Sequence, residues 1–237
     1  MKRLVLIAAS LLAIVTTGLS QAAAPAKPVL PVISIQQVDT DDPVVYAALI
    51  AQNNAAVKEK TGKDHYFRVY VGQHAGQDSG VAFAVSAAES FAALAANTDL
   101  AQNDPAVVEN RAHLNAIRKL GPARLLKAVR YDGTHAGAYL LNTYAVLSDE
   151  AAYLAALNDL RALFDSHDLK DVKINAYRVL AGRDEYTHLI SLNCPSAAVR
   201  GALMDAMATE PWGAQWLAAA GKFRTVVRNG TFREITR

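Results

Sequence analysis

Apolar and polar positions along the chain form short alternating runs and longer runs with helical spacing, and this succession occurs twice. Pro105 interrupts the longest helical region of the first series, because proline lacks the amide hydrogen that a helix needs. The second series repeats the same order from about residue 138 to residue 228. The first series predicts a strand at 32–38, a helix at about 39–62, strands at 66–74 and 80–86, helix at about 89–120 and a strand at 123–131.

Matching residues recur in the two series at an almost constant separation. The frame Ala75-Gly76-x-Asp78 returns 106 residues later as Ala181-Gly182-x-Asp184, and Tyr46 returns 107 residues later as Tyr153. We expect both frames at the turn between the second and third strands of a series, where glycine gives the backbone freedom that a turn needs. The matches predict an internal duplication, with repeats at 32–134 and 135–237.

The order strand–helix–strand–strand–helix–strand is that of the ferredoxin-like split βαβ unit. Such a unit forms a four-stranded antiparallel sheet with both helices on one face, and the other face must be covered. Two units in one chain can cover each other. We therefore predict an α+β fold in which two ferredoxin-like βαββαβ repeats pack their antiparallel sheets into one α+β barrel.

The first 24 residues are typical of a secretory signal peptide. Lys2 and Arg3 precede an apolar run of about a dozen residues and a small-residue stretch that ends in alanines. The run is shorter than the roughly 20 residues of a membrane span. The leader is of bacterial type, so we expect a periplasmic or secreted protein, with cleavage near Ala22–Ala24 and a linker at 25–31.

The charge and the cysteine content of the chain limit the classes of partner that it is expected to bind. Lys2 and Arg3 would leave with the leader and no acidic residue would, so the remaining chain has 22 basic and 22 acidic residues. This balance favours neither nucleic acid nor, after cleavage, a membrane surface as partner. Cys194 is the single cysteine, so no intramolecular disulfide can form, and the lipid-modified cysteine of a lipoprotein is missing near the cleavage region. We expect a buried, inert thiol and a monomer or homodimer.

The stretch "GQHAGQDSGVAFAVSAAESFAALAANTDLAQNDP" shows a strand, a glycine turn, a strand and a helix that breaks before a proline. In this succession the chain resembles the dimeric α+β barrel superfamily, with its antibiotic-biosynthesis-monooxygenase-like and NIPSNAP-like proteins, as a tandem fused version. The resemblance covers nearly the whole chain after the leader as topology. The resemblance implies that the chain is a cofactor-free monooxygenase, a haem-degrading enzyme, a dismutase or a protein of unknown role. The fold alone does not choose among these classes.

Alternation along the strands predicts which side chains face the space between the sheets. Arg68 and Tyr70 share one face of the second strand, and Asn175 and Tyr177 share one face of its counterpart. The 106-residue separation would instead pair Arg68 with Ile174, so a bulge or a one-residue slip is needed. The candidate ligand-binding residues are Arg68, Tyr70, His74, Asn142, Tyr144, Asn175, Tyr177 and His188. Tyrosines that simply fill the barrel are the alternative for each of them.

Other chemistry finds less support. The histidines show no zinc spacing, so we expect no metal site, and no P-loop, dinucleotide or Gly-x-Ser-x-Gly motif occurs. His113 lies in the helical region where haem-degrading relatives place an iron ligand, so it is a weak haem-ligand candidate, and otherwise no cofactor is predicted. The tripeptide at Asn229 matches a glycosylation acceptor, which we interpret as a turn.

Three functions stay open. The first is an exported protein of unknown activity that binds a small apolar or aromatic molecule between the two sheets, with His74 or His188 as acid or base if chemistry follows. The second is a cofactor-free monooxygenase or a haem-binding or haem-degrading enzyme. The third is a structural or interaction domain whose sheets fill each other. A cavity lined by tyrosine and histidine would favour the first two.

Overall fold

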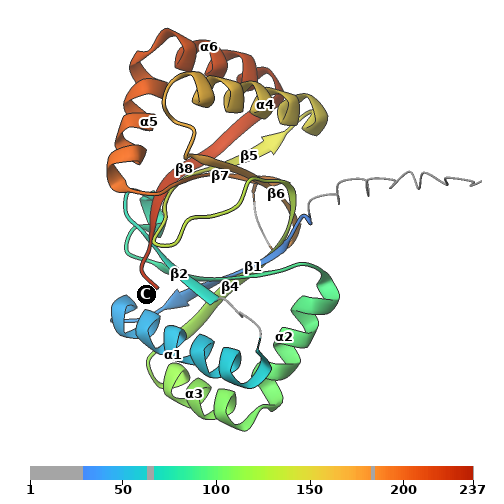
Figure 1. Ribbon diagram of the computed structural model, residues 1–237, viewed down its shortest axis with the longest axis vertical. Coiled ribbons are helices and arrows are strands. Elements are labelled where there is room, and N and C mark those ends of the chain that lie inside the picture. The colour runs from blue at the N-terminus through green and yellow to red at the C-terminus, as the bar shows by residue number, and fades with distance from the viewer. Residues whose placement is uncertain (1–28, 63–66, 183–184, 237) are drawn as a thin grey trace, which may run out of the picture.

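In the computed structural model, which describes residues 29–62, 67–182 and 185–236, eight strands close into one barrel and helices cover it on two opposite sides. Figure 1 shows α1, α2 and α3 on one side of the barrel and α4, α5 and α6 on the other. The signal-peptide and linker predictions for residues 1–28 lie outside the described residues. No helix in the described part is long and apolar enough to cross a membrane.

The two halves of the chain contain the same succession of elements. In the first half these are β1 (Val32–Asp39), α1 (Pro43–Thr61), β2 (Phe67–Gly72), the short 3-10 turn η1 (Gly76–Asp78), β3 (Ala82–Ala88), α2 (Phe91–Asn103), α3 (Pro105–Ala116) and β4 (Lys119–Tyr131). In the second half they are β5 (Tyr139–Leu147), α4 (Glu150–Ser166), β6 (Lys173–Ala181), β7 (His188–Cys194), α5 (Ala197–Thr209), α6 (Pro211–Ala220), η2 (Gly221–Phe223) and β8 (Arg224–Glu234).

Strand pairing confirms the predicted fold class. Each half forms a four-stranded antiparallel sheet, in the order β4-β1-β3-β2 in the first and β8-β5-β7-β6 in the second. Pairing of β2 with β8 and of β4 with β6, both antiparallel, joins the two sheets into a closed barrel. The apolar face that each ferredoxin-like sheet would leave uncovered therefore turns into a shared interior.

The one-residue slip between the halves is real and falls at the turn after the second strand. Arg68 and Tyr70 of β2 occupy the places of Asn175 and Tyr177 of β6, a separation of 107 residues. From β3 and β7 onward the separation is 106, and Ser90 and Ser196 cap α2 and α5 in the same way. The turn between β6 and β7 is thus effectively one residue shorter, which preserves the inward faces on both sides of it.

In each half, a tyrosine of the first helix contacts an arginine at the start of the last strand. Arg118 directly precedes β4, and Arg224 is the first residue of β8. Tyr46 of α1 is fully buried and accepts a hydrogen bond from Arg118 Nη1 at 3.0 Å. Tyr153 of α4 is also fully buried and accepts one from Arg224 Nη1 at 2.5 Å. Each guanidinium also lies over the ring of its tyrosine. Burial raises the pKa of both phenols and the nearby arginine lowers it, with burial the larger effect.

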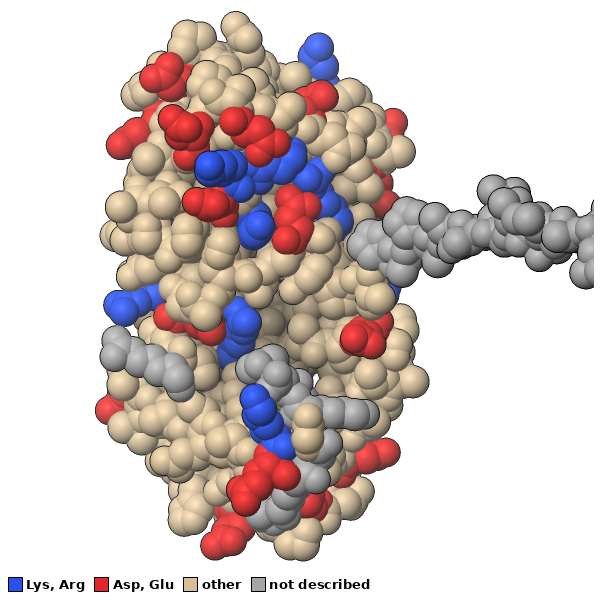
Figure 2. All heavy atoms as spheres, viewed as in Figure 1, with Lys and Arg blue, Asp and Glu red and all other residues tan. Residues whose placement is uncertain are grey.

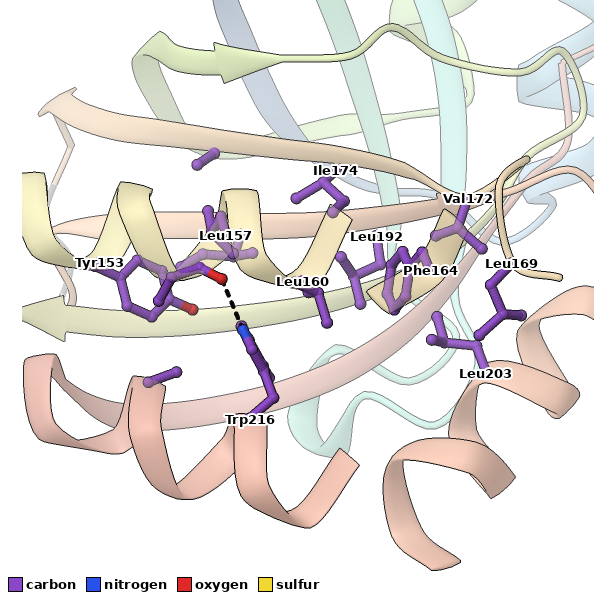
Figure 3. Close-up of a cluster of buried hydrophobic side chains, with 14 of the residues drawn as sticks. Tyr153, Leu157, Leu160, Phe164, Leu169, Val172, Ile174, Leu192, Leu203 and Trp216 are labelled. Carbon is purple, nitrogen blue, oxygen red and sulfur yellow. Dashed lines mark hydrogen bonds between the residues drawn. The ribbon is translucent and has the colours of Figure 1, made fainter. Parts of the chain in front are cut away.

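The helices bury apolar side chains against the outer faces of the sheets. Figure 3 shows the larger of these cores, where α4 and α6 contact each other and Trp216 Nε1 donates a hydrogen bond to the carbonyl oxygen of Ala156 at 2.7 Å. Leu203 of α5 joins the same core. The predicted buried thiol also lies here: Cys194 is fully buried, and burial raises its pKa to about 12.

One turn prediction is wrong. The tripeptide that begins at Asn229 lies inside β8, where Asn229, Gly230 and Thr231 pair with β5. Glycine at this position permits a close approach, because a Cβ on Gly230 would lie 3.1 Å from the Cβ of Ala75. Pairing with β5 and contact with the β2–β3 turn therefore override the local turn signal.

Candidate functional site

The inner faces of the barrel strands enclose a cavity of about 210 Å³. Residues from both halves line it, so neither half would form it alone. Aliphatic and phenylalanine side chains make up much of the wall, and tyrosines, amides, hydroxyl residues and two arginines make up the rest. The lining residues are Ile33, Ile35, Arg68, Tyr70, Phe83, Val85, Ala87, Arg124, Leu126, Tyr131, Thr134, Leu140, Asn142, Tyr144, Asn175, Tyr177, Tyr186, Leu189, Ser191, Asn193 and Phe232.

A partly buried ion pair lies beside the cavity where β2 meets β8. Arg68 Nη1 lies 3.4 Å from Glu234 Oε2 and donates a hydrogen bond to the carbonyl oxygen of His135 at 3.0 Å. Glu234 also accepts from the amide of Ala138 at 3.3 Å. Burial raises the pKa of the Glu234 carboxyl, although Arg68 opposes this effect. The pair therefore joins the two halves and balances the charge of Arg68.

Three tyrosines approach one another next to this ion pair. Burial raises the pKa of Tyr70, and the nearby Glu234 adds to the increase. Burial also raises the pKa of Tyr177 well above its usual value, and its neighbours Tyr131 and Tyr70 add to the effect. Phenols with raised pKa values stay protonated at neutral pH, so they can donate hydrogen bonds but are poor general bases.

A second polar cluster lies where β8 passes the turns of both halves. Arg228 Nη1 donates a hydrogen bond to Asp78 Oδ2 at 2.5 Å, and its guanidinium lies 4.2 Å from the ring centre of Tyr144. Tyr144 in turn packs edge-to-face on Tyr186, with ring centres 4.8 Å apart. Gly72 makes the β2–β3 turn possible, because a Cβ there would lie 2.0 Å from the carbonyl oxygen of Asp78.

The amides that line the cavity have different roles. Asn175 Oδ1 accepts a hydrogen bond from the Asp132 amide at 2.9 Å, and its Nδ2 donates to the Gly133 carbonyl at 2.8 Å. Asn193 Oδ1 accepts from the His135 amide at 3.1 Å. These two side chains hold the β4–β5 loop. Asn142 differs, because its buried Oδ1 has no hydrogen-bond partner among the described residues.

The structure brings most of the predicted site residues together at the cavity. Alternation along β2, β5 and β6 placed these side chains correctly because those strands are regular there. Their role in binding a ligand stays a prediction. The predicted residues that line the cavity are Arg68, Tyr70, Asn142, Tyr144, Asn175 and Tyr177.

The two predicted histidines lie elsewhere. His74 is exposed and follows the end of β2 at Gly72, so strand alternation no longer applies to it. His188 is buried, but on the outer face of β7, where its Nε2 lies 2.7 Å from Glu150 Oε2 at the start of α4. Neither can act as acid or base in the cavity. The expectation of a histidine in the lining was wrong.

The barrel cavity does not fit haem. His113 is exposed on α3, on the outside of the barrel, and lines neither of the two described cavities. No histidine or cysteine lies among the lining residues of the barrel cavity, and a volume of about 210 Å³ is small for a porphyrin. In the described part of the chain, no group of three or more His, Cys, Asp and Glu side chains could hold a metal ion.

A second hollow of about 430 Å³ lies on the outer side of the second sheet, between α5, α6 and strands β5, β7 and β8. Its wall is largely apolar and includes the buried Leu192 and Trp216, with Thr143, Arg224 and Asn229 as its polar members. Met204, Leu217 and Val226 border it and are 43%, 40% and 40% exposed. This hollow therefore opens to the surface and differs from the barrel cavity.

Sequence reasoning missed several residues of the barrel site. Tyr131, Tyr186 and Phe232 line the cavity, and Glu234 and Arg228 anchor its two polar clusters. The predicted end of the last strand at residue 228 hid Phe232 and Glu234. Continued alternation from Gly230 through Glu234 is the signal that could have found them.

Charged side chains on the surface have both signs. Figure 2 shows blue and red atoms interspersed over the second half, with no continuous basic stripe on this face, and a hollow between the two halves. This distribution agrees with the 22 basic and 22 acidic residues that follow residue 24. It offers no basic track for a nucleic-acid backbone on the face shown.

No family model matches the chain, and no curated protein is detectably similar to it in sequence. A proposed monooxygenase from Lactobacillus acidophilus NCFM has a TM-score of 0.54 at 8% identity, over 86% of this chain and 93% of that one. An anthrone oxidase-like protein has a TM-score of 0.50 at 14% identity, over 86% and 90%. A chlorite dismutase from Candidatus Nitrospira defluvii reaches 0.49 at 12% identity, over 86% and 92%.

Identities this low show the fold and nothing about activity. The chain has the α+β barrel fold that its resemblance implied, with a proposed monooxygenase and an anthrone oxidase-like protein among its structural neighbours. The NIPSNAP-like part of the resemblance stays a prediction.

Proposed function

We propose that the protein binds a small, largely apolar aromatic molecule inside the barrel. The carrying observation is the cavity of about 210 Å³ with aliphatic and aromatic walls. An engineered apolar cavity of about 150 Å³ binds benzene, so this one would accept a compound of one or two rings. A purely structural barrel would fill this space with side chains.

Binding is better supported than catalysis. A cofactor-free oxygenase would need a base to activate its substrate, and the described lining contains no histidine or carboxylate. Tyr70, Tyr144 and Tyr177 face the cavity and have raised pKa values because they are buried. The arrangement is therefore suited to holding a neutral molecule.

The experiment is a calorimetric titration with indene, a two-ring hydrocarbon. Val85→Phe would fill part of the cavity and weaken indene binding at least about tenfold, since overpacked sites resist insertion. Val146→Phe, at an exposed position of β5, would leave it unchanged. Circular dichroism would check that both variants fold. Failure of indene to bind, or equal binding by Val85→Phe, would contradict the proposal.

We also infer that the protein is exported and works in the periplasm or outside the cell. The basic start and apolar run of residues 1–24 support this inference. Fractionation of bacteria that express the full chain would find it outside the cytoplasm, shortened by about two dozen residues. Retention of the full-length chain in the cytoplasm would contradict export.

We infer further that the two halves arose by duplication. The common element order, the near-constant separation and the equivalent Tyr46–Arg118 and Tyr153–Arg224 pairs support this view. Relatives that consist of one half would test it. Since one chain closes the barrel by itself, a partner chain is not needed to complete the cavity, and the choice between monomer and homodimer stays a prediction.

A further inference from the structure

We propose that the second hollow, between α5, α6 and the outer face of the second sheet, binds an unbranched aliphatic carboxylic acid. The carboxylate pairs with Arg224, and the chain lies against the apolar wall. This space differs from the barrel cavity, so the proposal does not depend on the function proposed for that cavity.

The rim of the hollow exposes apolar side chains that the fold does not need. Met204 and Leu217 border it and are 43% and 40% exposed. Exposed apolar side chains grouped around a hollow are typical of a ligand-binding groove. Their equivalents in the first half, 106 residues earlier, are Thr98 and Arg111. Since the first half folds with polar residues at these places, the apolar rim serves something other than folding.

Methionine is concentrated in this wall. Beyond Met1 the chain has two methionines, Met204 and Met207, and both line the hollow. The unbranched, flexible side chain of methionine adapts to apolar surfaces of different shape. Such a wall suits an alkyl chain, which is itself flexible.

The hollow extends along β8. Arg224 is the first and Asn229 the last residue of this strand in its wall, with Val226 between them. Five residues of extended strand cover about 16 Å. The volume of about 430 Å³ also exceeds the 210 Å³ of the barrel cavity. An apolar wall of this length matches an extended chain better than a compact ring.

The charge of the hollow comes from one side chain. Arg224 is the only ionisable residue among the described residues that line it. Its Nη1 donates a hydrogen bond to the hydroxyl oxygen of Tyr153 at 2.5 Å, and its guanidinium lies 5.3 Å from a ring centre of Trp216. No carboxylate pairs with Arg224 in the described part of the chain. A guanidinium has five N–H donors, so donors remain for a carboxylate.

The polar groups farther along β8 are neutral and bond each other. Thr143 Oγ1 donates a hydrogen bond to Asn229 Oδ1 at 2.8 Å. The head group of an acid is therefore expected at Arg224, with the chain running towards Asn229.

Probes of equal chain length separate the head groups. Octanoate is negatively charged, 1-octanol is neutral and octylammonium is positively charged. We expect calorimetry to show octanoate binding about tenfold more tightly than 1-octanol, the range of one charge-assisted hydrogen bond. Octylammonium would bind more weakly than 1-octanol, because Arg224 repels it. Hexanoate would bind about tenfold more weakly than octanoate, because it buries two methylenes fewer.

Variants of α5 locate the site. Ala208→Phe places a ring in the hollow from an exposed position of its wall, and would weaken octanoate binding at least about tenfold. Ala202→Phe is the matched control, since Ala202 is exposed on the same helix and does not line the hollow. Val85→Phe in the barrel would leave octanoate binding unchanged, and Ala208→Phe would leave indene binding unchanged, so the two proposals can fail separately.

Variants of Arg224 test the head group. Arg224→Gln would lower octanoate binding to the level of 1-octanol, while the binding of 1-octanol changes less than about twofold. Arg224→Lys keeps the charge and would keep the preference for octanoate. Arg118→Gln is the matched control, because Arg118 bonds Tyr46 in the first half as Arg224 bonds Tyr153. Circular dichroism checks folding, and the three probes test the charge on the wild type should Arg224→Gln fail to fold.

Several results would overturn the proposal. Octanoate may not bind, or it may bind equally to Ala208→Phe, and then the hollow is not its site. An octanoate preference that survives in Arg224→Gln means that another group holds the carboxylate. If sedimentation shows a dimer that Ala208→Phe converts to a monomer, and octanoate binds to neither, a second copy of the chain covers the hollow.

Discussion

The helices over the second half bury a leucine and a tryptophan at two positions where α2 and α3 of the first half have asparagines. Leu203 of α5 corresponds to Asn97 of α2, and Trp216 of α6 corresponds to Asn110 of α3. Leu203 is fully buried, while none of the side chains described in α2 is buried and Phe91 at its start is 50% exposed.

This difference shows that one fold can be stabilised unequally on its two sides. The barrel strands and the capping residues are similar in both halves, as Ser90 and Ser196 illustrate. The apolar core beneath the helices differs between the halves, because the buried cluster over the second sheet is much larger than the cluster over the first. We therefore expect stability to depend mainly on the second half, and four predictions test this comparison.

The largest effect is expected at Trp216. Trp216→Ala would remove a buried ring and its hydrogen bond to Ala156, and lower the free energy of unfolding by about 3–5 kcal/mol. Asn110→Ala at the equivalent place in α3 would change it by less than about 0.5 kcal/mol. Urea unfolding measures both. A similar loss in the two variants would contradict the unequal cores.

The equivalent tyrosines should instead behave alike. Tyr46→Phe and Tyr153→Phe would each remove one hydrogen bond from an arginine and lower the free energy of unfolding by about 1–2 kcal/mol. Urea unfolding of the two variants checks this. A loss confined to one of them would show that the shared geometry is not energetically equivalent.

A buried amide in the first half should be a weakness. Asn53 of α1 is 6% exposed with an Oδ1 that has no hydrogen-bond partner among the described residues, and its counterpart in α4 is the fully buried Leu160. Asn53→Leu would raise the free energy of unfolding by about 1 kcal/mol, because an unsatisfied acceptor is removed. Thermal unfolding would show it as a higher midpoint.

Asn54 is the matched control for this change. Its amide donates to the Phe67 carbonyl at 2.8 Å and accepts from the Phe67 amide at 3.1 Å. Asn54→Leu would therefore lower the midpoint. If Asn53→Leu lowers it as well, Asn53 has a partner or a packing role that its orphaned oxygen does not reveal.

The smallest effect is expected on the stability at acidic pH, through the carboxyl of Glu150. A hydrogen bond from Arg178 has the largest influence on the pKa of the Glu150 carboxyl and lowers it. Burial opposes this effect and a hydrogen bond from His188 adds to it, so that the pKa falls from 4.5 to about 2. A carboxyl with a lowered folded pKa stabilises the fold above its unfolded pKa, so this contribution is lost as the pH falls from about 4.5 towards 2.

Unfolding measured across this range would show the stability gap between wild type and Glu150→Gln narrowing as the pH falls. Glu109→Gln, at an exposed position of α3, is the control and would show no such narrowing. A gap that stays constant from pH 5 to pH 2 would mean that Glu150 contributes through packing alone. Pro43 occupies the equivalent place in α1, so the first half has no counterpart of this ion pair.

The element order, the break at Pro105 and the closed α+β barrel could all be predicted, since apolar periodicity and proline act locally along the chain. Among the site residues, those within regular strands were placed correctly, as Tyr70 and Tyr177 show. His74 and His188 were not. The first lies beyond the end of its strand, and the second lies on the outer face of β7.

Periodicity and spacing thus determined which residues form strands, that two similar halves exist, and that their sheets must cover each other. Only the tertiary structure decided where β8 ends, since its pairing with β5 continues through Gly230 against the local turn signal. It also decided which cavity amides are already bonded: Asn175 holds a loop, while Asn142 keeps an oxygen without a partner among the described residues. The hydrogen-bond partners of Asn175 lie far from it in the chain, so a local sequence pattern cannot assign them. They are decided when the barrel closes and brings the distant segments together.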